Sequence, residues 1–404
     1  MNIGIVTTWF ERGAGYVSRQ YRDVLNQRHA VHIYARGGEG SAQGDPEWEA
    51  SHVTWGKKVL DATAVDIKDF EKWLDKNKIE LVIFNEQRIW EPVLFCNKLG
   101  IKTGAYVDYY TEETVRFFDI YDFMLCNTQR HYSVFSWHPQ CFYIPWGTNI
   151  TLFKPKTLEA VSPDQITFFH SAGMSPDRKG TDLVLKAFAD IVGPVKLVIH
   201  SQVELEPFFP ELVPLMRQLQ QKNRLETHYR TVAAPGLYHL GDVYVYPTRL
   251  DGIGLSINEA LACGLPVITC DNPPMNEFVK HGVNGRLVPV SQLIARSDGY
   301  YWPQCFVSQE SLFIQMNWYI ENLANLASFK KQARDRAEQH LDWSKNAVEL
   351  GNLLTNVRKR PAQEIADSTR RTLLFDQRVM PLRLKYKQLY NLYTLGKRVI
   401  SKLK

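Results

Sequence analysis

The sequence predicts an α/β protein with two doubly wound domains, each built on a parallel sheet. Three observations carry this prediction. Short β-branched or apolar runs alternate with longer stretches of helical periodicity, as in repeated βα units. The pattern is interrupted near Pro145, Gly147 and Pro155 and then begins again. The chain has 404 residues, which is enough for two domains with a core each.

The first domain is expected over residues 1–150 and the second over residues 151–345. Expected strands of the first lie at residues 3–7, 31–34, 81–84, 103–107 and 123–126, and those of the second at 166–171, 195–200, 243–246 and 266–269. These runs are nearly continuous in apolar residues, which favours strands covered by helices on both faces, such as a helix at 182–192. A cleft between the two domains is the default binding site.

Residues 346–404 are expected to form a C-terminal helical segment with a basic amphipathic tail at 382–404, where Leu, Tyr, Ile and Val alternate with Lys and Arg. From Pro361 onward Lys and Arg outnumber Asp and Glu by ten to three, so this stretch has a net charge of +7. The whole chain has a net charge of +5, so the residues before Pro361 together carry −2. Two interpretations of the tail stay open: a solvated face packed on the body, or docking on an anionic membrane surface. Basicity confined to the tail disfavours nucleic acid as a partner.

The N-terminus lacks a basic leader, and no apolar run approaches the roughly 18 residues that a membrane helix needs. We therefore expect a cytoplasmic protein, soluble or peripheral on the inner face of the membrane. The six cysteines form no C-x-x-C pair and are expected to be reduced core residues. Neither D-x-D nor a His/Cys/Asp cluster with metal-ligand spacing occurs, so we expect no cofactor and no metal.

The segment 247–269 is the most informative part of the chain. A strand is followed by a turn with Asp251, Gly252, Ile253 and Gly254, and then by a helix expected from Leu255 to residue 263. Glycines at a helix N-terminus let a ligand approach the backbone, whose free N–H groups bind phosphate oxygens. Residues 252–255 are thus expected to bind an anion. Asp251 and Glu259 can accept hydrogen bonds from sugar hydroxyls on either side of the phosphates.

This segment resembles the acid, seven residues, acid motif of the retaining GT-B glycosyltransferases of family four, also called glycosyl transferases group 1. Residues 170–182 are similar to the family's diphosphate-binding stretch, with Lys179 and Gly180 at the expected positions. Met174 stands at the family's arginine position, and we expect Arg178 to supply the guanidinium instead. The resemblance extends over most of residues 1–345 and implies the GT-B fold, in which two Rossmann-like domains face each other across a cleft.

The resemblance implies transfer of a hexosyl group, with retention and without a metal, from a nucleotide diphosphate sugar. A UDP-sugar is the favoured donor, and the acceptor is a glycan, a protein or a lipid-linked molecule, as in polysaccharide biosynthesis. Arg178 and Lys179 would neutralise the departing diphosphate. Asp251 would contact the donor sugar, although it is one methylene shorter than the family's glutamate, and Glu259 would hold the ribose.

Near the N-terminus, Gly13 and Gly15 follow the first strand and match the family's glycine loop. A dinucleotide fingerprint is disfavoured because Ser18 replaces its third glycine and the second strand ends at Arg36 instead of an acid. Asp108 stands where the family has a histidine; a carboxyl group donates a hydrogen bond only when protonated, so we expect it to accept from a sugar or acceptor hydroxyl.

Two alternatives to a transferase remain. One is a sugar-nucleotide epimerase or hydrolase of the same fold. The other is a catalytically silent nucleotide-sugar-binding module, which the residues at Met174, Asp108 and Asp251 allow.

Overall fold

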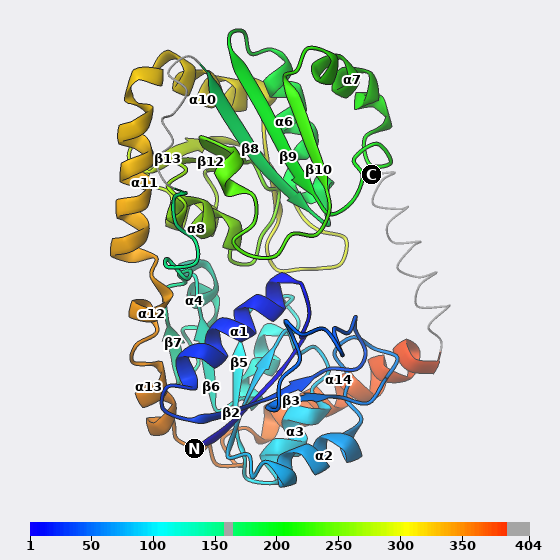
Figure 1. The fold of residues 1–404 in the computed structure, drawn as a ribbon. Coiled ribbons are helices and arrows are strands. Elements are labelled where there is room, and N and C mark those ends of the chain that lie inside the picture. Colours follow the sequence, from blue (N-terminus) through cyan, green and yellow to red (C-terminus); the bar gives the residue numbers. More distant parts are fainter. Residues whose placement is uncertain (157–164, 386–404) are drawn as a thin grey trace. The chain divides into compact units, whose positions relative to one another are not determined.

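The protein is described by a computed structural model that covers residues 1–156 and 165–385. The chain divides into two compact units. The first comprises Met1–Pro145, Arg296–Tyr301 and the residues from Ala347 onward, and the second comprises Trp146–Ala295 and Trp302–Asn346. Each unit is a doubly wound α/β structure with a parallel sheet, as predicted (Figure 1).

The first unit has a parallel sheet with strand order β3-β2-β1-β4-β5-β6-β7. The order reverses between β1 and β4, and ligands of doubly wound sheets bind at the carboxyl ends of the strands at such a point. All five residues of β4 are buried, which explains its continuous apolar run. The strands are β1 (Asn2–Thr7), β2 (Ala30–Ala35), β3 (Val53–Trp55), β4 (Leu81–Asn85), β5 (Lys102–Tyr106), β6 (Phe123–Cys126) and β7 (Cys141–Tyr143).

The helices of the first unit follow its strands and return at the end of the chain. In α1, the buried Val17, Tyr21, Val24 and Leu25 recur at helical spacing and form one apolar face. The helices are α1 (Gly13–Leu25), α2 (Ile67–Lys76), α3 (Glu91–Lys98), the 3₁₀ helix η1 (Val115–Ile120), α4 (Gln129–Phe135), α13 (Leu350–Asn356) and α14 (Ala366–Lys385).

The second unit has a parallel sheet with strand order β10-β9-β8-β11-β12-β13, which reverses between β8 and β11. An antiparallel hairpin of β14 and β15 follows. The strands are β8 (Ile166–Gly173), β9 (Val195–Ser201), β10 (Leu225–Tyr229), β11 (Val243–Tyr246), β12 (Val267–Cys270), β13 (Gly285–Val288), β14 (Val290–Ile294) and β15 (Gln304–Val307).

The helices of the second unit begin with two short ones that lead away from β8. The predicted helix at 182–192 corresponds to α6. The helices are α5 (Pro176–Lys179), α6 (Thr181–Ala189), α7 (Val213–Gln221), α8 (Leu255–Ala262), α9 (Met275–Phe278), α10 (Gln309–Glu321), α11 (Leu326–His340) and α12 (Trp343–Asn346), with 3₁₀ turns η2 (Pro210–Leu212), η3 (Tyr238–Leu240) and η4 (Leu323–Asn325).

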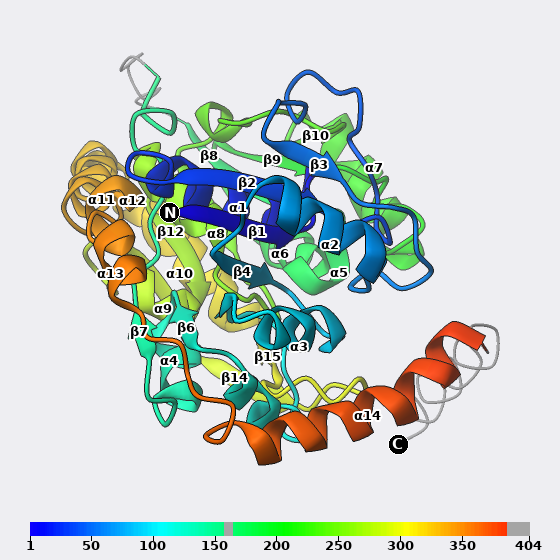
Figure 2. The same cartoon turned by 90° about the horizontal axis from the view of Figure 1, so that it is seen from below.

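The C-terminal segment packs on the first unit. His29 Nε2 lies 3.0 Å from the carbonyl oxygen of Gly351, and α13 contacts α1. Helix α14 contacts η1 and α3 (Figure 2). Most of the predicted basic tail at 382–404 lies outside the described residues. Within the ranges that the structure describes, none of the helices combines the length and apolarity needed to cross a bilayer.

Candidate functional site

Two loops of the second unit meet at the carboxyl ends of β8 and β11. Gly180, between α5 and α6, has φ 73°, and a Cβ there would lie 2.4 Å from the carbonyl oxygen of Pro247. Only glycine therefore allows the loop after β8 to approach the loop after β11 so closely. The fully buried His170 also joins the two strands, because its Nδ1 lies 2.8 Å from the oxygen of Val245 and its Nε2 2.8 Å from Thr181 Oγ1.

The loop after β11 leads into α8, as predicted. Gly254 is the N-cap residue with φ 80° and ψ 48°, a left-handed conformation that favours glycine. The N-cap residue is a glycine and has no side chain that could cap this helix end. The backbone of Gly252, Ile253, Gly254 and Leu255 therefore forms the start of the helix, where N–H groups and the helix dipole favour an anion.

Arg178, Lys179 and Asp251 form one ion-paired cluster beside this helix end. Lys179 Nζ lies 3.0 and 2.9 Å from the two carboxylate oxygens of Asp251, and Arg178 Nη1 lies 3.1 Å from Oδ1. Arg178 also donates to the carbonyl oxygen of Leu250 at 2.6 Å. Met174, at the position of the family's arginine, is 61% exposed. The structure thus brings the two predicted cations together through the predicted carboxylate.

Tyr246 completes this cluster, and the sequence analysis missed it. Its hydroxyl donates to Asp251 Oδ2 at 2.6 Å and also contacts Lys179 Nζ, whose ammonium lies 4.7 Å from the ring centroid. Tyr246 is the last residue of the buried strand β11. A hydroxyl-bearing aromatic residue at the carboxyl end of a central strand was the available signal.

The pKa values of the cluster reflect burial and mutual charge. Burial, and next the charge of the neighbouring Arg178, lower the pKa of Lys179 to about 8, while Asp251 opposes the change. Burial alone would raise the pKa of Asp251, but Lys179 and Arg178 outweigh it, so that this pKa lies well below its usual range. At neutral pH Asp251 is therefore ionised and partly neutralises both cations.

Glu259 lies one turn into α8. Its carboxylate accepts a hydrogen bond of 2.6 Å from the hydroxyl of Tyr238, a residue of η3 that the sequence analysis also missed. Burial raises the pKa of Glu259, although Tyr238 and Lys179 partly offset the change. Tyr238 thus holds the Glu259 side chain in a fixed orientation.

The remaining predicted residues, Gly13, Gly15 and Asp108, belong to the first unit. Gly13 begins α1. At Gly15 a Cβ would lie 2.4 Å from the carbonyl oxygen of Phe10, so the helix approaches the preceding loop closely only because this residue is glycine. Asp108 follows β5. The structure therefore distributes the predicted residues over both units.

Asp108 is paired with Glu86, which the sequence analysis missed. Glu86 directly follows β4 and has φ 53°, a strained conformation for a residue with a side chain. The two carboxyl groups are hydrogen-bonded. Burial, and next the charge of Glu86, raise the pKa of Asp108 well above its usual range. Arg12 Nη2 lies 3.6 Å from Glu86 Oε2. Asp108 therefore holds a proton readily and can donate a hydrogen bond, which an ionised carboxylate cannot.

His131 is 1% exposed and its Nδ1 lies 2.9 Å from the hydroxyl of Tyr110, so it is a core residue. Among the residues described, no three His, Cys, Asp or Glu side chains are grouped so that they could hold a metal ion.

Part of the chain matches a known protein family. Residues 165–297 match the family described as Glycosyl transferases group 1, so the prediction of such a domain is confirmed for this part of the chain. The matched range includes Arg178, Lys179, Asp251 and Glu259.

Two curated relatives are similar in sequence. The first is the GtfA subunit of the UDP-N-acetylglucosamine–peptide N-acetylglucosaminyltransferase of Streptococcus pneumoniae serotype 4. It is 26% identical to this chain over 263 residues, and the alignment covers 58% of this chain and 50% of the relative. The corresponding subunit of Streptococcus agalactiae is 28% identical over 106 residues, or 23% of this chain and 21% of the relative. The chain therefore spans about half the length, or less, of these relatives.

Solved structures share the fold. HepE of Anabaena with UDP and glucose has a TM-score of 0.68 at 16% identity, over 88% of this chain and 99% of that one. WaaG, described as a glycosyltransferase involved in lipopolysaccharide biosynthesis, has a TM-score of 0.62 at 14% identity, over 87% and 99%. Pneumococcal GtfA with UDP and GlcNAc has a TM-score of 0.56 at 15% identity, over 72% and 61%. The two Rossmann-like units match GT-B structures, and the predicted fold class is confirmed.

Proposed function

We propose that this chain is a retaining, metal-independent GT-B glycosyltransferase of family four that transfers a hexosyl group from a UDP-sugar. One observation carries the proposal: Arg178 and Lys179 converge on Asp251 beside the start of α8, whose N-cap residue is Gly254, inside the range that matches glycosyl transferases group 1. Fixed cations and helix N–H groups are what a diphosphate requires.

In the proposed reaction the bond between the sugar and the diphosphate breaks, and the leaving diphosphate gains negative charge. Arg178 and Lys179 stabilise this charge, as do the N–H groups at 252–255, because all are in position before the bond breaks. Asp251 holds the cations until the donor binds, and the diphosphate then takes over part of this pairing. Glu259, oriented by Tyr238, accepts hydrogen bonds from the ribose.

The choice of UDP rests on the similar proteins. The HepE structure contains UDP and glucose, and the pneumococcal GtfA structure contains UDP and GlcNAc. The acceptor in our proposal is a glycan, a protein or a lipid-linked molecule. The S. pneumoniae relative is named for transfer to peptide and WaaG for lipopolysaccharide biosynthesis, which supports this range.

A thermal-shift series tests the donor site. UDP, GDP, ADP and TDP are added in the presence of EDTA, and unfolding is followed for the wild type, Lys179→Ala and Lys330→Ala. Lys330 is the matched control because it also pairs with an aspartate of the second unit, with Nζ 3.0 Å from Asp242. Saturation at a hundred times Kd stabilises by about 2.7 kcal/mol. We expect UDP to raise Tm of the wild type and the control, but not of Lys179→Ala.

The product distinguishes a transferase from the other activities. With labelled UDP-sugar alone, an epimerase or hydrolase converts the donor, whereas a transferase needs an added acceptor. The anomeric configuration of the product then tests retention. UDP binding without turnover on any acceptor would support the silent module, and no shift with any nucleotide would reject the donor site.

The proposal includes a peripheral position on the inner face of the membrane through residues 382–404, whose Lys and Arg alternate with apolar residues. Deletion of these residues is expected to reduce binding to anionic vesicles more than turnover of a soluble acceptor. Equal vesicle binding by the full-length and truncated chains would reject this part of the proposal.

A further inference from the structure

The first unit contains a groove that the proposed donor site does not use. It is a cavity of about 880 Å³ between α3 and the segment from Lys359 to Leu373, within the roughly 300–1,000 Å³ typical of ligand sites. Its lining is mainly apolar and includes Leu94, Phe95, Ile365 and Leu373. Leu373 and its neighbour Leu374 are 45% and 59% exposed, so the apolar surface continues beyond the groove.

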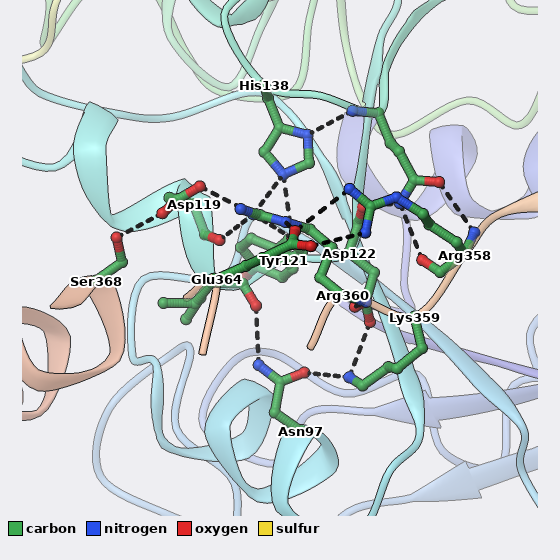
Figure 3. A network of polar contacts seen from close by, with 12 residues as sticks. Asn97, Asp119, Tyr121, Asp122, His138, Arg358, Lys359, Arg360, Glu364 and Ser368 are labelled. Atoms are coloured by element: carbon green, nitrogen blue, oxygen red, sulfur yellow. Dashed lines mark hydrogen bonds and ion pairs between the residues drawn. The ribbon is translucent and has the colours of Figure 1, made fainter. Parts of the chain in front are cut away.

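The two walls of the groove are joined by a buried carboxylate (Figure 3). The Asp122 side chain, 1% exposed, accepts from Lys359 Nζ at 2.9 Å and from the backbone N–H of Arg360 at 2.7 Å. Lys359 Nζ also donates to Asn97 Oδ1 of α3 at 2.7 Å. Lys359 thus links Asp122, which directly precedes β6, to Asn97 of α3, the helix that forms one wall of the groove.

Asp119 fixes the start of α14 in the same way. It accepts from Arg360 Nη1 at 2.9 Å and from Ser368 Oγ at 2.6 Å (Figure 3). Farther along α14, Asp376 Oδ2 accepts from the backbone N–H of Trp90 at 3.0 Å. The groove is therefore formed before any ligand binds, and a preformed site loses less conformational entropy on binding.

The charges on the groove are of two kinds. Lys359 and Arg360 are neutralised by Asp122 and Asp119, as just described. The exposed Lys98 and Arg370 also line the groove, yet neither side chain forms an ion pair or hydrogen bond with any residue of the ranges 1–156 and 165–385. Glu91 is the carboxyl group on the lining, at the opposite end of α3 from Lys98, and partial burial raises its pKa.

Helix geometry places each unpaired cation beside apolar groups. Lys98 is four residues after Leu94 on α3, and Arg370 precedes Leu373 and Leu374 by three and four residues on α14. Residues at these spacings share a helix face. Each wall therefore presents an apolar surface with one cation at its side, which is the complement of an acyl chain that ends in a phosphate.

We propose that this groove binds an anionic phospholipid of a membrane surface, with an acyl chain along the apolar lining and the phosphate between Lys98 and Arg370. The sequence after α14 favours a membrane as the source, since residues 386–404 contain five Lys and Arg and no Asp or Glu. This inference goes beyond the proposed donor site and does not depend on it.

Flotation with vesicles tests the charged part of the site. Full-length protein is mixed with vesicles of phosphatidylcholine alone or with phosphatidylglycerol, at low and at high salt. The double variant Lys98→Gln/Arg370→Gln is compared with Arg217→Gln/Lys222→Gln, which removes the same charges from exposed positions of the second unit. At about fivefold per cation near an anionic surface, we expect the groove variant to bind roughly 25-fold more weakly, and the control to bind like the wild type.

A second pair of variants tests the apolar part at constant charge. Ala366→Trp places a large side chain on the groove lining, and Val192→Trp places one at a position that is 85% exposed in the second unit. Circular dichroism and Tm confirm that each variant is folded. We expect Ala366→Trp to weaken binding to phosphatidylglycerol vesicles and Val192→Trp not to.

Three results would overturn the inference. The first is vesicle binding by both groove variants equal to that of their controls, as expected if the basic tail alone contacts lipid. The second is equal binding to vesicles with and without phosphatidylglycerol. The third is a concentration-dependent dimer, measured by sedimentation without lipid, that Ala366→Trp converts to a monomer, because the groove would then be occupied by a second copy of the chain.

Discussion

The carboxyl edges of the two sheets have the same architecture but opposite chemistry. In the second unit, the edge of β8 and β11 carries two cations held by one carboxylate, Asp251. In the first unit, the edge of β4 and β5 carries two carboxyl groups, Glu86 and Asp108, that are hydrogen-bonded to each other. A doubly wound sheet therefore determines where a site lies, while the side chains at the strand ends determine whether it suits an anion or a hydroxyl group.

Removing a cation from the second unit should have the largest effect. Lys179→Ala is expected to lower kcat/KM by about a hundred- to a thousandfold, the loss typical of one preorganised charge-stabilising group. Steady-state kinetics with UDP-sugar and acceptor measure it, with Lys330→Ala as the control. Wild-type turnover by Lys179→Ala would contradict the cationic role of this edge.

Removing the carboxylate from the same edge should separate stability from binding. Asp251→Asn leaves two adjacent, partly buried cations without their anion, so we expect the free energy of unfolding to fall by about 2 kcal/mol, the loss of charge-assisted hydrogen bonds. UDP binding should persist, because the cations that bind the diphosphate remain. Chemical denaturation and UDP titration measure the two effects, and Asp242→Asn, at the other Lys–Asp pair, is the control. Loss of UDP binding as complete as in Lys179→Ala would contradict this division of roles.

The depressed pKa of Lys179 predicts an alkaline limit to activity. With a pKa of about 8 in the free enzyme, Lys179 loses its proton above that pH, so kcat/KM for the donor should fall about tenfold per pH unit. Lys179→Arg keeps its charge and should shift the fall to higher pH. The free energy of unfolding should change in the opposite direction from activity. Because the pKa of Lys179 is lower in the folded than in the unfolded chain, the free energy of unfolding should rise between about pH 8 and 10.5. A pH profile unchanged in Lys179→Arg would assign the limit to another group.

The smallest effect is expected in the first unit. The folded-state pKa of Asp108 is raised, so this carboxyl group costs stability as pH rises above its ordinary range. Asp108→Asn removes that cost, so the free energy of unfolding at pH 8 should increase by an amount on the order of 1 kcal/mol, and Tm with it, with less change at pH 4. UDP binding should not change. A lower Tm at pH 8 would show that the ionised form of Asp108 is stabilised after all.

The sequence predicted the buried strands and missed the short or polar ones. Residues 81–84 were recognised because β4 is apolar throughout. Strands β3 and β7 have three residues each, which is too short for a recognisable run, and β10 reads Leu-Glu-Thr-His-Tyr, which is largely polar. Strand β13 was missed because Gly285 begins it and Arg286 interrupts it. Their pairing depends on neighbouring strands, which a local pattern does not contain.

At the candidate site, the sequence indicated the charged residues but not their partners. Lys179, Asp251 and Glu259 stand in recognisable spacings. Tyr246 and Tyr238 do not. Tyr246 lies only five residues before Asp251, but it ends a buried strand and its residue type is that of a core residue. Tyr238 lies in a 3₁₀ turn 21 residues before Glu259. Glu86 was missed for another reason: its conformation, φ 53°, is a property of the folded backbone and leaves no trace in residue type.

The attachment of Lys359 and Arg360 to Asp122 also bears on how the chain folds during synthesis. The first unit begins at Met1 but includes residues from Ala347 onward, and the buried carboxylate of Asp122 has its ammonium partner at Lys359. The N-terminal residues leave the ribosome first. More than two hundred further residues, including the whole second unit, are therefore synthesised between Asp122 and its partner Lys359. The second unit can therefore complete its fold while the first is still unfinished.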